Sequence, residues 1–258
     1  MRSIDPDPAE RRPDPFLDQQ MTRYHLDPDS IRKLFNSVAP TYDFLNHLLS
    51  LRRDVSWRRE AIRELDGFQG FILDVATGTA DLAMEALSRE EHSRSVMGLD
   101  FSEAMLRAAQ QKLQKRHLSD RIFLSLGDAV SLPFRDGSFS ASMIAFGLRN
   151  IPEKDRALRE MVRVTREGGR VILLEFTLPR KGVMKILYPI YFTKILPWVG
   201  GRVSGDKGAY AYLPESVFRF RYPEDYEELM RRSGLDQVHS RHLTFGIVSL
   251  MVGTKRHR

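Results

Sequence analysis

Cysteine is absent from all 258 residues of this sequence. Its absence excludes disulfide scaffolds, zinc–thiolate sites, iron–sulfur clusters and enzymes with a cysteine nucleophile. A long uninterrupted apolar run is also absent, because the longest apolar segment, Val183–Val199, is broken by Lys185, Pro189, Lys194 and Pro197. Since a membrane-spanning helix needs about 20 predominantly apolar residues, we expect a protein that is soluble or lies on a membrane surface.

A strong excess of one charge sign is absent as well. The chain has 40 basic and 34 acidic residues, which gives a formal net charge of +6. This small excess favours an anionic partner, either nucleic acid or a lipid surface, without choosing between them. Residues 1–29 are rich in proline and aspartate and lack the apolar core of a secretory signal. We therefore expect a poorly ordered tail there, one folded domain over residues 30–258, and a cytoplasmic protein.

The sequence does contain a regular alternation of short aliphatic runs and longer helical patterns. Short, mostly aliphatic runs are typical of strands that are buried on both faces. Their alternation with helices predicts an α/β protein with a parallel, doubly wound sheet. A further strand, antiparallel at the end of the sheet, is expected at Phe245–Gly253. The other expected strands are Phe71–Ala76, Ser95–Asp100, Arg121–Leu126, Ala141–Phe146 and Arg170–Phe176.

Three helical regions are marked by composition or by their end signals. Residues 30–65 are expected to form Arg-rich helices. Ser102 is a suitable N-cap for a helix, and a further helix is expected from Glu153 to Arg166, ended by Gly168 and Gly169. The helix after Ser102 has one apolar face, formed by Met105, Leu106, Ala109 and Leu113.

The first expected strand runs directly into a turn of small residues. The sequence LDVATGTADLA (Leu73–Ala83) places these residues between a buried strand and the next helix. Small residues let the backbone approach a ligand, and the N–H groups at a helix start face that ligand. With Gly78 as its one glycine, the turn lacks the dinucleotide-binding fingerprint, and no Gly-Lys-Ser/Thr follows as in a phosphate loop. A purely structural tight turn would use the same residues.

Acidic residues follow the second and third expected strands. Asp100 ends the second strand, 22 residues after Gly78, where a carboxylate can accept both hydroxyls of a ribose. After the third strand, Asp128 could accept from an adenine amino group and the Ala129 N–H could donate to a ring nitrogen. Each acid taken alone is equally a helix cap or a surface charge. Together, at neighbouring strand ends, they indicate a ribose and an adenine without a phosphate loop, which favours S-adenosylmethionine over NAD or ATP.

Several stretches of the sequence resemble known methyltransferases. LDVATGTADLA, GLDFSEAML, GDAVSLPF and the strand Ala141–Phe146 follow the order of class I S-adenosylmethionine methyltransferases. The resemblance to one narrower family, the UbiE/MenG quinone C-methyltransferases, covers Ile31–Lys255. Members of this family methylate a ring carbon of a polyprenylated hydroquinone in menaquinone or ubiquinone biosynthesis. The stretches that carry this resemblance are YDFLNHLLS (Tyr42–Ser50), Phe146–Phe176, AYAYLPESV (Ala209–Val217) and GIVSLMVGTK (Gly246–Lys255).

The resemblance implies a fold, a cofactor and a set of binding residues. The fold is α/β, the Rossmann-like class I methyltransferase fold: a mostly parallel seven-stranded sheet with helices on both faces. N-terminal cap helices over residues 30–66 and a substrate lid over 178–222 are implied as well. The implied cofactor is S-adenosylmethionine, with S-adenosylhomocysteine as the product and no metal. The implied cofactor-binding residues are Asp74, Ala76, Gly78, Thr79, Asp100, Phe101, Asp128, Ala129 and Phe146.

The reaction that the resemblance implies is C-methylation of demethylmenaquinol to menaquinol. Methylation of a polyprenyl methoxy-benzoquinol, in ubiquinone biosynthesis, is the alternative. Two other classes stay open: an RNA methyltransferase, suggested by the Arg-rich stretch 52–63, and a non-catalytic S-adenosylmethionine-binding protein. We expect a polyprenylated hydroquinone as partner, no nucleic acid, transient association with the inner membrane face, and either a monomer or a homo-oligomer.

Some positions depart from the usual pattern of the family. Ala80 stands where a glycine is common, which is tolerable only if Ala80 keeps a negative φ. Ala145 stands where many relatives have a serine that touches the cofactor, so that contact is not expected here. His47 stands where aspartate is common, and Asp54-Val55 replace a common His-Arg pair. These last changes put any base on this helix in doubt.

Methylation of a hydroquinone ring needs a carbon that becomes nucleophilic when a hydroxyl loses its proton. A phenol has a pKa of about 10, so the site must favour the phenolate or place a base beside it. Arg149 is expected to stabilise the phenolate and Asn150 to orient a hydroxyl, with Tyr42 as a hydrogen-bond partner or lid. An ion pair at the strand end would equally explain Arg149, and packing would explain Tyr42. His47 is either a base or a surface residue.

The segment Val183–Val199 follows the fifth expected strand. Its aromatic residues and flanking cations are typical of an element at a membrane interface. We expect Phe192 and Trp198 to contact the isoprenoid tail or the bilayer. A buried helical hairpin or a dimer contact is the alternative.

Overall fold

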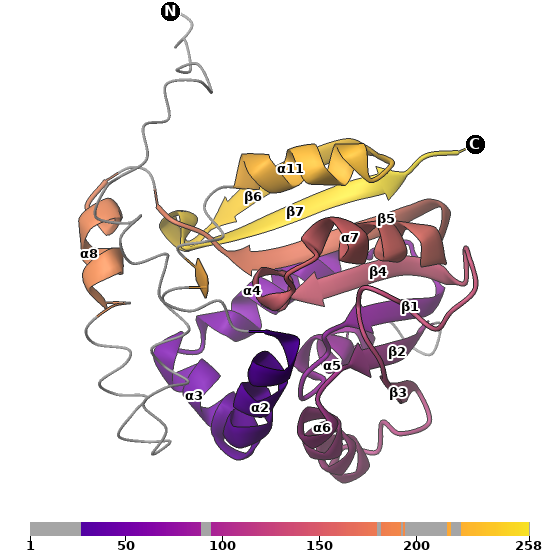
Figure 1. Ribbon diagram of the computed structural model, residues 1–258, viewed down its shortest axis with the longest axis horizontal. Coiled ribbons are helices and arrows are strands. Elements are labelled where there is room, and N and C mark those ends of the chain that lie inside the picture. The colour runs from indigo at the N-terminus through magenta and orange to yellow at the C-terminus, as the bar shows by residue number, and fades with distance from the viewer. Residues whose placement is uncertain are drawn as a thin grey trace, which may run out of the picture.

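One mixed sheet forms the centre of the molecule (Figure 1). The structure, a computed structural model, describes residues 27–88, 94–179, 182–191, 193, 216–217 and 223–257. Within them, the strand order is β3-β2-β1-β4-β5-β7-β6. The first five strands pair in parallel, and β7 pairs antiparallel with both β5 and β6. The strands are β1 (Gly70–Val75), β2 (Arg94–Asp100), β3 (Ile122–Leu126), β4 (Phe139–Ala145), β5 (Thr165–Phe176), β6 (Leu235–Leu243) and β7 (Val248–Lys255).

This topology confirms the predicted α/β fold with a doubly wound, mostly parallel sheet. The five parallel strands lie where the aliphatic runs predict them, and the last strand is antiparallel as expected. Its predicted place at the end of the sheet is wrong, because β7 lies between β5 and β6. The edge is β6, a strand with mostly exposed or half-buried side chains that the sequence patterns do not reveal.

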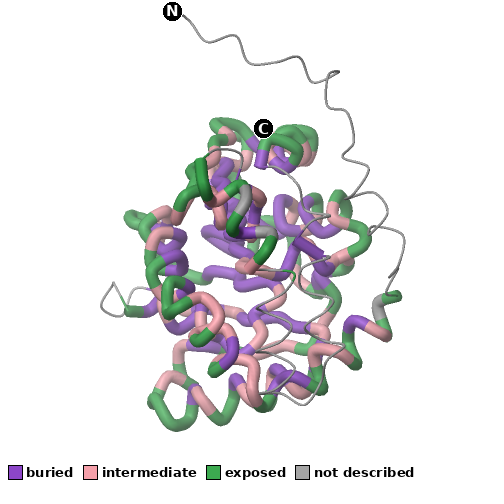
Figure 2. Tube along the Cα trace, turned by 90° about the vertical axis from the view of Figure 1, so that its left-hand side faces the viewer, coloured by how far each residue is buried: buried purple, intermediate pink, exposed green. Residues whose placement is uncertain are grey.

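Helices cover both faces of the sheet (Figure 1). One face packs against α4 (Arg53–Arg63), α5 (Asp81–Leu87) and α6 (Glu103–Lys115). The other packs against α7 (Lys154–Val164) and α11 (Pro223–Arg232). The buried residues are concentrated in the strands and on the helix faces that touch them (Figure 2). Burial of these two apolar layers is the main stabilising contribution expected for such a fold.

The predicted helix start at Ser102 is confirmed, whereas the predicted helix end at Gly168 and Gly169 is wrong. Ser102 caps α6 as predicted, because its side chain accepts from the Met105 N–H. The predicted end of the second helix is wrong, since α7 ends at Val164 and β5 begins at the next residue. Gly169 instead lies in the first part of β5, where the pairing with β4 is irregular. A side chain does not fit there, because an added Cβ would lie 2.6 Å from the Ser140 carbonyl oxygen.

A third layer lies beyond the carboxyl ends of the parallel strands (Figure 1). It consists of α2 (Pro28–Val38), the 3₁₀ turn η2 (Ala39–Thr41), α3 (Tyr42–Leu49) and α8 (Met184–Ile190), which share a small apolar cluster with α6. Asp27 caps α2, so the helix begins two residues before the predicted start of the domain. None of the described helices is long and apolar enough to cross a bilayer. Phe192, Trp198 and most of the expected tail and lid lie outside the described residues.

Candidate active site

The loop after β1 makes its turn with several residues in the left-handed region. The backbone φ is 52° at Ala76, 56° at Gly78 and 67° at Ala80. The condition that Ala80 keeps a negative φ is therefore not met. The Ala80 N–H donates to the Thr77 carbonyl oxygen at 2.9 Å, directly before α5 begins. This tight turn imposes on alanine a conformation that favours glycine.

Asp100, at the end of β2, is fixed by the backbone around it. Its carboxylate accepts from the Gly78 N–H at 2.8 Å and from the Ser102 N–H at 2.9 Å. Burial raises the pKa of this carboxyl to about 6, although these N–H groups act in the opposite direction. Asp100 is thus an ionised acceptor at neutral pH that is already held against the β1 loop.

Asp74 and Thr79 support the loop from behind. Thr77 donates its hydroxyl to Asp74 at 2.6 Å, and burial, together with the charge of Asp100, raises the Asp74 pKa to about 7. Thr79 donates its hydroxyl at 2.5 Å to Asp43 on α3. Both side chains therefore make contacts within the protein that fix the loop and the helix above it.

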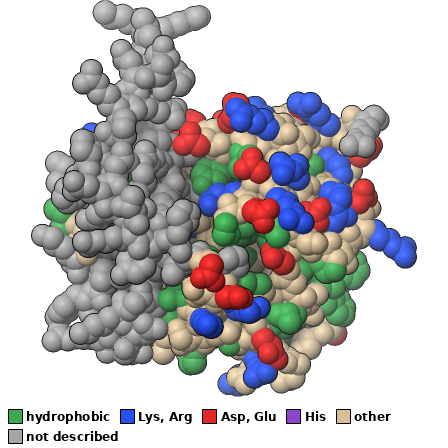
Figure 3. Space-filling model, viewed as in Figure 1, with side chains coloured by type: hydrophobic (Ala, Val, Ile, Leu, Met, Phe, Trp, Pro, Cys, Tyr) green, Lys and Arg blue, Asp and Glu red, His purple; other side chains and the backbone are tan. Residues whose placement is uncertain are grey.

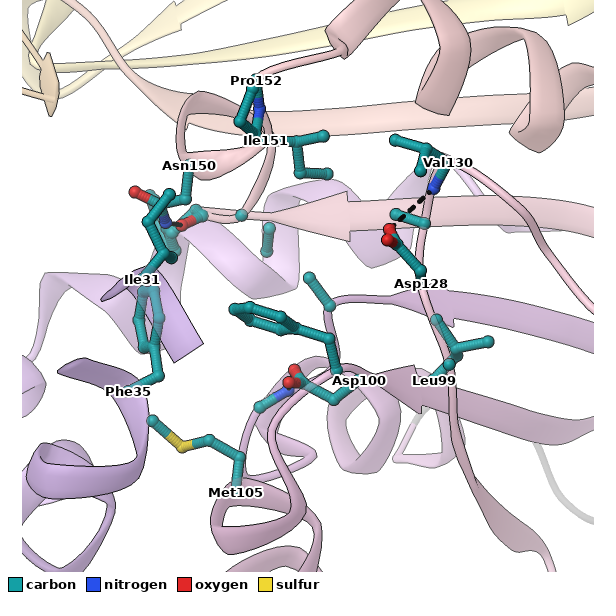
Figure 4. Close-up of a pocket in the computed structure, with 18 of the residues that line it drawn as sticks. Ile31, Phe35, Leu99, Asp100, Met105, Asp128, Val130, Asn150, Ile151 and Pro152 are labelled. Carbon is teal, nitrogen blue, oxygen red and sulfur yellow. Dashed lines mark hydrogen bonds between the residues drawn. The ribbon is translucent and has the colours of Figure 1, made fainter. Parts of the chain in front are cut away.

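A cavity of about 190 Å³ opens at the carboxyl ends of β1, β2, β3 and β4. Ile31 and Phe35 of α2 lie across it from Asp128 and Val130, and Asp100 lies at its wall (Figure 4). Asp128 accepts from the Val130 N–H at 3.0 Å. Seven of the nine predicted cofactor-binding residues line this cavity, namely Ala76, Gly78, Asp100, Phe101, Asp128, Ala129 and Phe146, whereas Asp74 and Thr79 do not.

A second, larger cavity of about 470 Å³ adjoins the first. It is bounded by α3, α4, α8 and the loop before β7, and most of its lining is apolar or aromatic. The polar side chains in its lining include Asn46, Ser50, Asp54, Arg58 and Arg149. Phe35, Tyr42, Phe146 and Asn150 line both cavities. A group bound in one cavity therefore lies next to a group bound in the other.

Arg149 lines the second cavity and also takes part in a buried ion pair. Its Nη1 lies 2.7 Å from a carboxylate oxygen of Glu175, and its Nε donates to Ser216 at 3.2 Å. The guanidinium also lies 5.4 Å from the ring centre of Phe176. The ion pair that the sequence left open is thus present, and it fixes Arg149 at the cavity wall.

Tyr42 stands at the junction of the two cavities. Its ring packs over Gly78 of the loop after β1, because a Cβ added to Gly78 would lie 3.9 Å from the ring. Burial raises the pKa of the Tyr42 phenol, while the positive charge of Arg149 and a hydrogen bond with Asn46 oppose that rise. Tyr42 therefore keeps its proton at neutral pH and is available as a donor. Asn150 is buried and lines the same junction.

Comparison with known proteins identifies the family of this chain. The model of the ubiE/COQ5 methyltransferase family matches residues 23–255. The chain belongs to this family. The match to a named family over nearly all of the chain confirms the family resemblance inferred from the sequence motifs.

Named members of the ubiE/COQ5 methyltransferase family are similar over their full length. A ubiquinone/menaquinone biosynthesis C-methyltransferase of Geobacter sulfurreducens is 39% identical, over 92% of this chain and 94% of its own length. A demethylmenaquinone methyltransferase of Thermus thermophilus is 44% identical, over 86% of this chain and 100% of its own length.

Solved structures support the fold of this family member. A S-adenosylmethionine-dependent methyltransferase of Thermotoga maritima superposes with a TM-score of 0.58 at 19% identity, covering 86% of this chain and 100% of that one. A phosphoethanolamine N-methyltransferase of Haemonchus contortus, in complex with S-adenosylhomocysteine, gives a TM-score of 0.55 at 15% identity, over 73% and 49% of the two chains. The fold is that of class I methyltransferases.

The network around Asp54 includes Arg58 and Asp81, which sequence reasoning missed. His47 Nδ1 lies 2.8 Å from an Asp54 oxygen, so the two unusual positions of the family pattern face each other. Arg58 donates to Asp54 at 2.6 Å and lies 3.4 Å from Asp81. His47, Asp54 and Asp81 are close enough to hold a metal ion, but the buried guanidinium of Arg58 already supplies the positive charge there. The i,i+4 spacing of Asp54 and Arg58 on α4 is the sequence signal that could have revealed this pair.

Glu175 is the other residue that sequence reasoning missed. It is 1% exposed and binds Arg149 through both the guanidinium and the backbone N–H. Its signal was a lone acid at the end of the apolar strand β5. Because a charge so deeply buried needs a partner, that position indicated a nearby cation.

Proposed function

We propose that this protein transfers a methyl group from S-adenosylmethionine to a ring carbon of demethylmenaquinol. The observation that carries the proposal is the pair of adjoining cavities with four shared wall residues, one cavity with the Asp100 carboxylate in its wall and the other largely apolar. The names of the relatives, which include demethylmenaquinone methyltransferase, support the substrate. A benzoquinol is the second candidate, because other relatives are named for ubiquinone as well as menaquinone biosynthesis.

The first cavity suits S-adenosylmethionine by its donor and acceptor groups. Asp100 would accept the ribose hydroxyls, and Asp128 with the Ala129 N–H would bind the adenine. The β1 loop, with Ala76 and Gly78 in the cavity wall, would lie against the methionine part. When bound, this cofactor supplies a methyl group on a positively charged sulfur.

The second cavity suits a phenol beside a positive charge. Tyr42 is itself a phenol at this wall, and the charge of Arg149 lowers its pKa relative to burial alone. A substrate hydroxyl in the same place would experience the same charge, which would favour its ionisation. Arg149 would thus stabilise the phenolate, while Asn150 and the protonated Tyr42 would donate to or orient a substrate oxygen. The hydroxyl's proton would leave to water or a nearby acceptor as the ring carbon becomes nucleophilic. After methyl transfer, the same ring carbon would lose its hydrogen as a second proton, which restores the aromatic ring.

The apolar remainder of the second cavity suits an isoprenoid tail. Its walls include Leu49, Leu187, Tyr191 and Ile247. Such a tail resides in a bilayer, so we place the protein in the cytoplasm with peripheral access to the inner membrane face. On the described surface in Figure 3, acidic and basic side chains are intermingled, and this does not favour a nucleic-acid substrate.

A pair of variants tests the role of Arg149. Removal of Arg149 alone would leave Glu175 buried without its partner, which typically costs about 3–5 kcal/mol of stability. We therefore expect the double variant Arg149→Gln/Glu175→Gln to fold. Its turnover should fall by about 10²–10³-fold, the usual cost of losing one electrostatic stabiliser. Its affinity for S-adenosylmethionine should change by no more than about threefold.

The matched control is Glu175→Gln, which keeps the positive charge of Arg149. It should retain far more turnover than the double variant. Initial rates on reduced demethylmenaquinone, together with calorimetric cofactor binding and thermal unfolding, separate these effects. If the double variant stays folded and turns over at nearly the wild-type rate, Arg149 has only a structural role.

A further inference from the structure

Two loops at the mouth of the second cavity share an unusual backbone. Leu51 and Arg52, between α3 and α4, have φ values of 52° and 60°. Thr244 and Phe245, before β7, have φ values of 45° and 57°. Such consecutive left-handed residues without glycine are strained and persist where the surrounding structure requires them. Strain of this kind often marks a functional site.

Each strained loop exposes one large apolar side chain. Leu51 is 82% exposed and Phe245 is 81% exposed, although both line the second cavity. Val183, Leu187 and Ile190 are also exposed, at the spacing of one helix face, on and just before α8. Leu187 lines the same cavity, and the Tyr191 hydroxyl donates to the Leu49 carbonyl oxygen at 2.7 Å, which joins this segment to α3. We call Leu51, Val183, Leu187, Ile190 and Phe245 the apolar rim.

Among the described residues, the exposed charges that adjoin the apolar rim in sequence are all positive. Arg52, Arg53 and Lys185 are exposed, and within the described residues no ion pair neutralises them. Some other exposed arginines have an acidic partner; Arg107, for example, lies 2.6 Å from Glu103. The acid nearest in sequence, Asp54, is buried and bound by Arg58. An apolar surface bordered by unneutralised cations is complementary to anionic lipid headgroups over an acyl layer.

We propose that the apolar rim docks on an anionic lipid bilayer, with Leu51 and Phe245 inserted at the headgroup boundary and Arg52, Arg53 and Lys185 against the headgroups. The strained loops hold both apolar tips outward at the cavity mouth. The inference rests on the proposed function in one respect: an isoprenoid tail then passes from the bilayer into the second cavity without crossing water. A second copy of this chain is the competing occupant of the same surface.

Vesicle flotation of the full chain tests this surface without any quinol. The probes are phosphatidylcholine vesicles with and without about a third of phosphatidylglycerol. The wild-type protein should bind the anionic vesicles and lose binding as salt is raised. Leu51→Ser/Phe245→Ser should bind at least about tenfold more weakly, since each buried apolar side chain contributes on that scale. Arg52→Gln should weaken binding to anionic vesicles alone.

Matched variants far from the rim control for general effects. Phe71→Ser/Phe123→Ser removes two other exposed rings, which contact each other on β1 and β3, and Arg116→Gln removes an exposed cation at the end of α6. These variants should bind vesicles like the wild type. Equal losses in rim and control variants would overturn the proposal. So would a wild-type protein that ignores anionic vesicles.

Sedimentation of the same proteins tests whether a second copy of this chain, and not a bilayer, covers the apolar rim. A wild-type dimer that Leu51→Ser/Phe245→Ser dissociates, together with no vesicle binding, would show an interface between copies and overturn the lipid proposal. Methyl transfer to a short-tailed, water-soluble quinol is measured in parallel. Vesicle binding without methyl transfer would contradict the proposed function and leave the docking surface standing, whereas the reverse result would contradict only the docking surface.

Discussion

Burial raises the pKa values of two carboxyl groups at the first cavity, one in its wall and one behind it. Asp74 and Asp100 are both almost fully buried, and their pKa values are raised to about 7 and about 6. Only Asp100 lines the cavity. Its ionised form accepts hydroxyl donors, whereas its neutral form has lost much of that strength. Under the proposed function, cofactor binding depends on a group whose pKa of about 6 lies in the mildly acidic range.

Affinity for S-adenosylmethionine should fall as the pH falls through about 6. A free aspartate would stay ionised down to a pH near 3.8, but the raised pKa of Asp100 makes it neutral earlier. If the neutral carboxyl binds poorly, linkage predicts a dissociation constant that rises up to about tenfold per pH unit below 6. Calorimetry between pH 5 and 8 measures this slope.

The control for this slope is Asp100→Asn. We expect its cofactor binding to be weaker by about 1–3 kcal/mol at pH 7.5, the scale of hydrogen bonds to a charged acceptor. Its affinity should also be flat between pH 5 and 7. A slope that survives in Asp100→Asn would belong to Asp74, and a flat wild-type profile would remove Asp100 from the ribose role.

For single residues, the sequence predicted where a side chain lies along a strand or loop better than which side chain it pairs with. The place of Asp100 follows from a strand end and a loop 22 residues earlier, which are local patterns. The partner of Arg149 is Glu175, which lies 26 residues away on the neighbouring strand. That pairing depends on the register of β4 and β5, which no local pattern contains. The positive φ of Ala80 likewise follows from how the whole turn closes.

Among the elements, those with strong aliphatic runs were predictable and β6 was not. Within β6, LDQVHSRHL, Leu235 is the one fully buried residue. Gln237 has a positive φ, and the pairing with β7 shifts between Asp236 and His239. An exposed, irregular edge strand carries no continuous apolar signal. Its place in the sheet comes from pairing with β7.

The C-terminal end of α6 offers a direct test of a local rule. The Leu118 N–H donates to Leu113 and the His117 N–H to Gln114, which is the hydrogen-bond pattern of a Schellman motif. His117 occupies the position where glycine is preferred, with a φ of 55°. We expect His117→Gly to raise the free energy of unfolding by about 0.5–1 kcal/mol, since relief of the φ strain exceeds the added freedom of the unfolded chain.

Urea denaturation of His117→Gly and of His117→Ala measures this difference. Alanine keeps a Cβ, so it should give little or no gain at this position. His117 is exposed, and loss of its side chain costs no core packing. Equal stability of the glycine and alanine variants would show that the backbone conformation carries no penalty here.

For the molecule as a whole, the position of both cavities follows from the sheet order. The order β3-β2-β1-β4-β5 reverses direction between β1 and β4, and ligands of such sheets bind at the carboxyl ends beside that reversal. The helices α2 and α3 lie over this edge (Figure 1). Lys112 of α6 bridges Asp43 and Asp81 at 2.5 Å and 2.6 Å, which joins α3 to α5 and α6. Cap and sheet therefore enclose the junction of the two cavities together.

The most direct test of the central claim is methyl transfer by the full chain. The protein is incubated with methyl-labelled S-adenosylmethionine and vesicles that contain reduced demethylmenaquinone or, separately, the polyprenyl methoxy-benzoquinol precursor of ubiquinone. We predict label on the ring of the naphthoquinol, and none with the oxidised quinone, which has no hydroxyl to ionise. Absence of label from both quinols, with the cofactor shown to bind, would contradict the claim that this protein is a quinol C-methyltransferase.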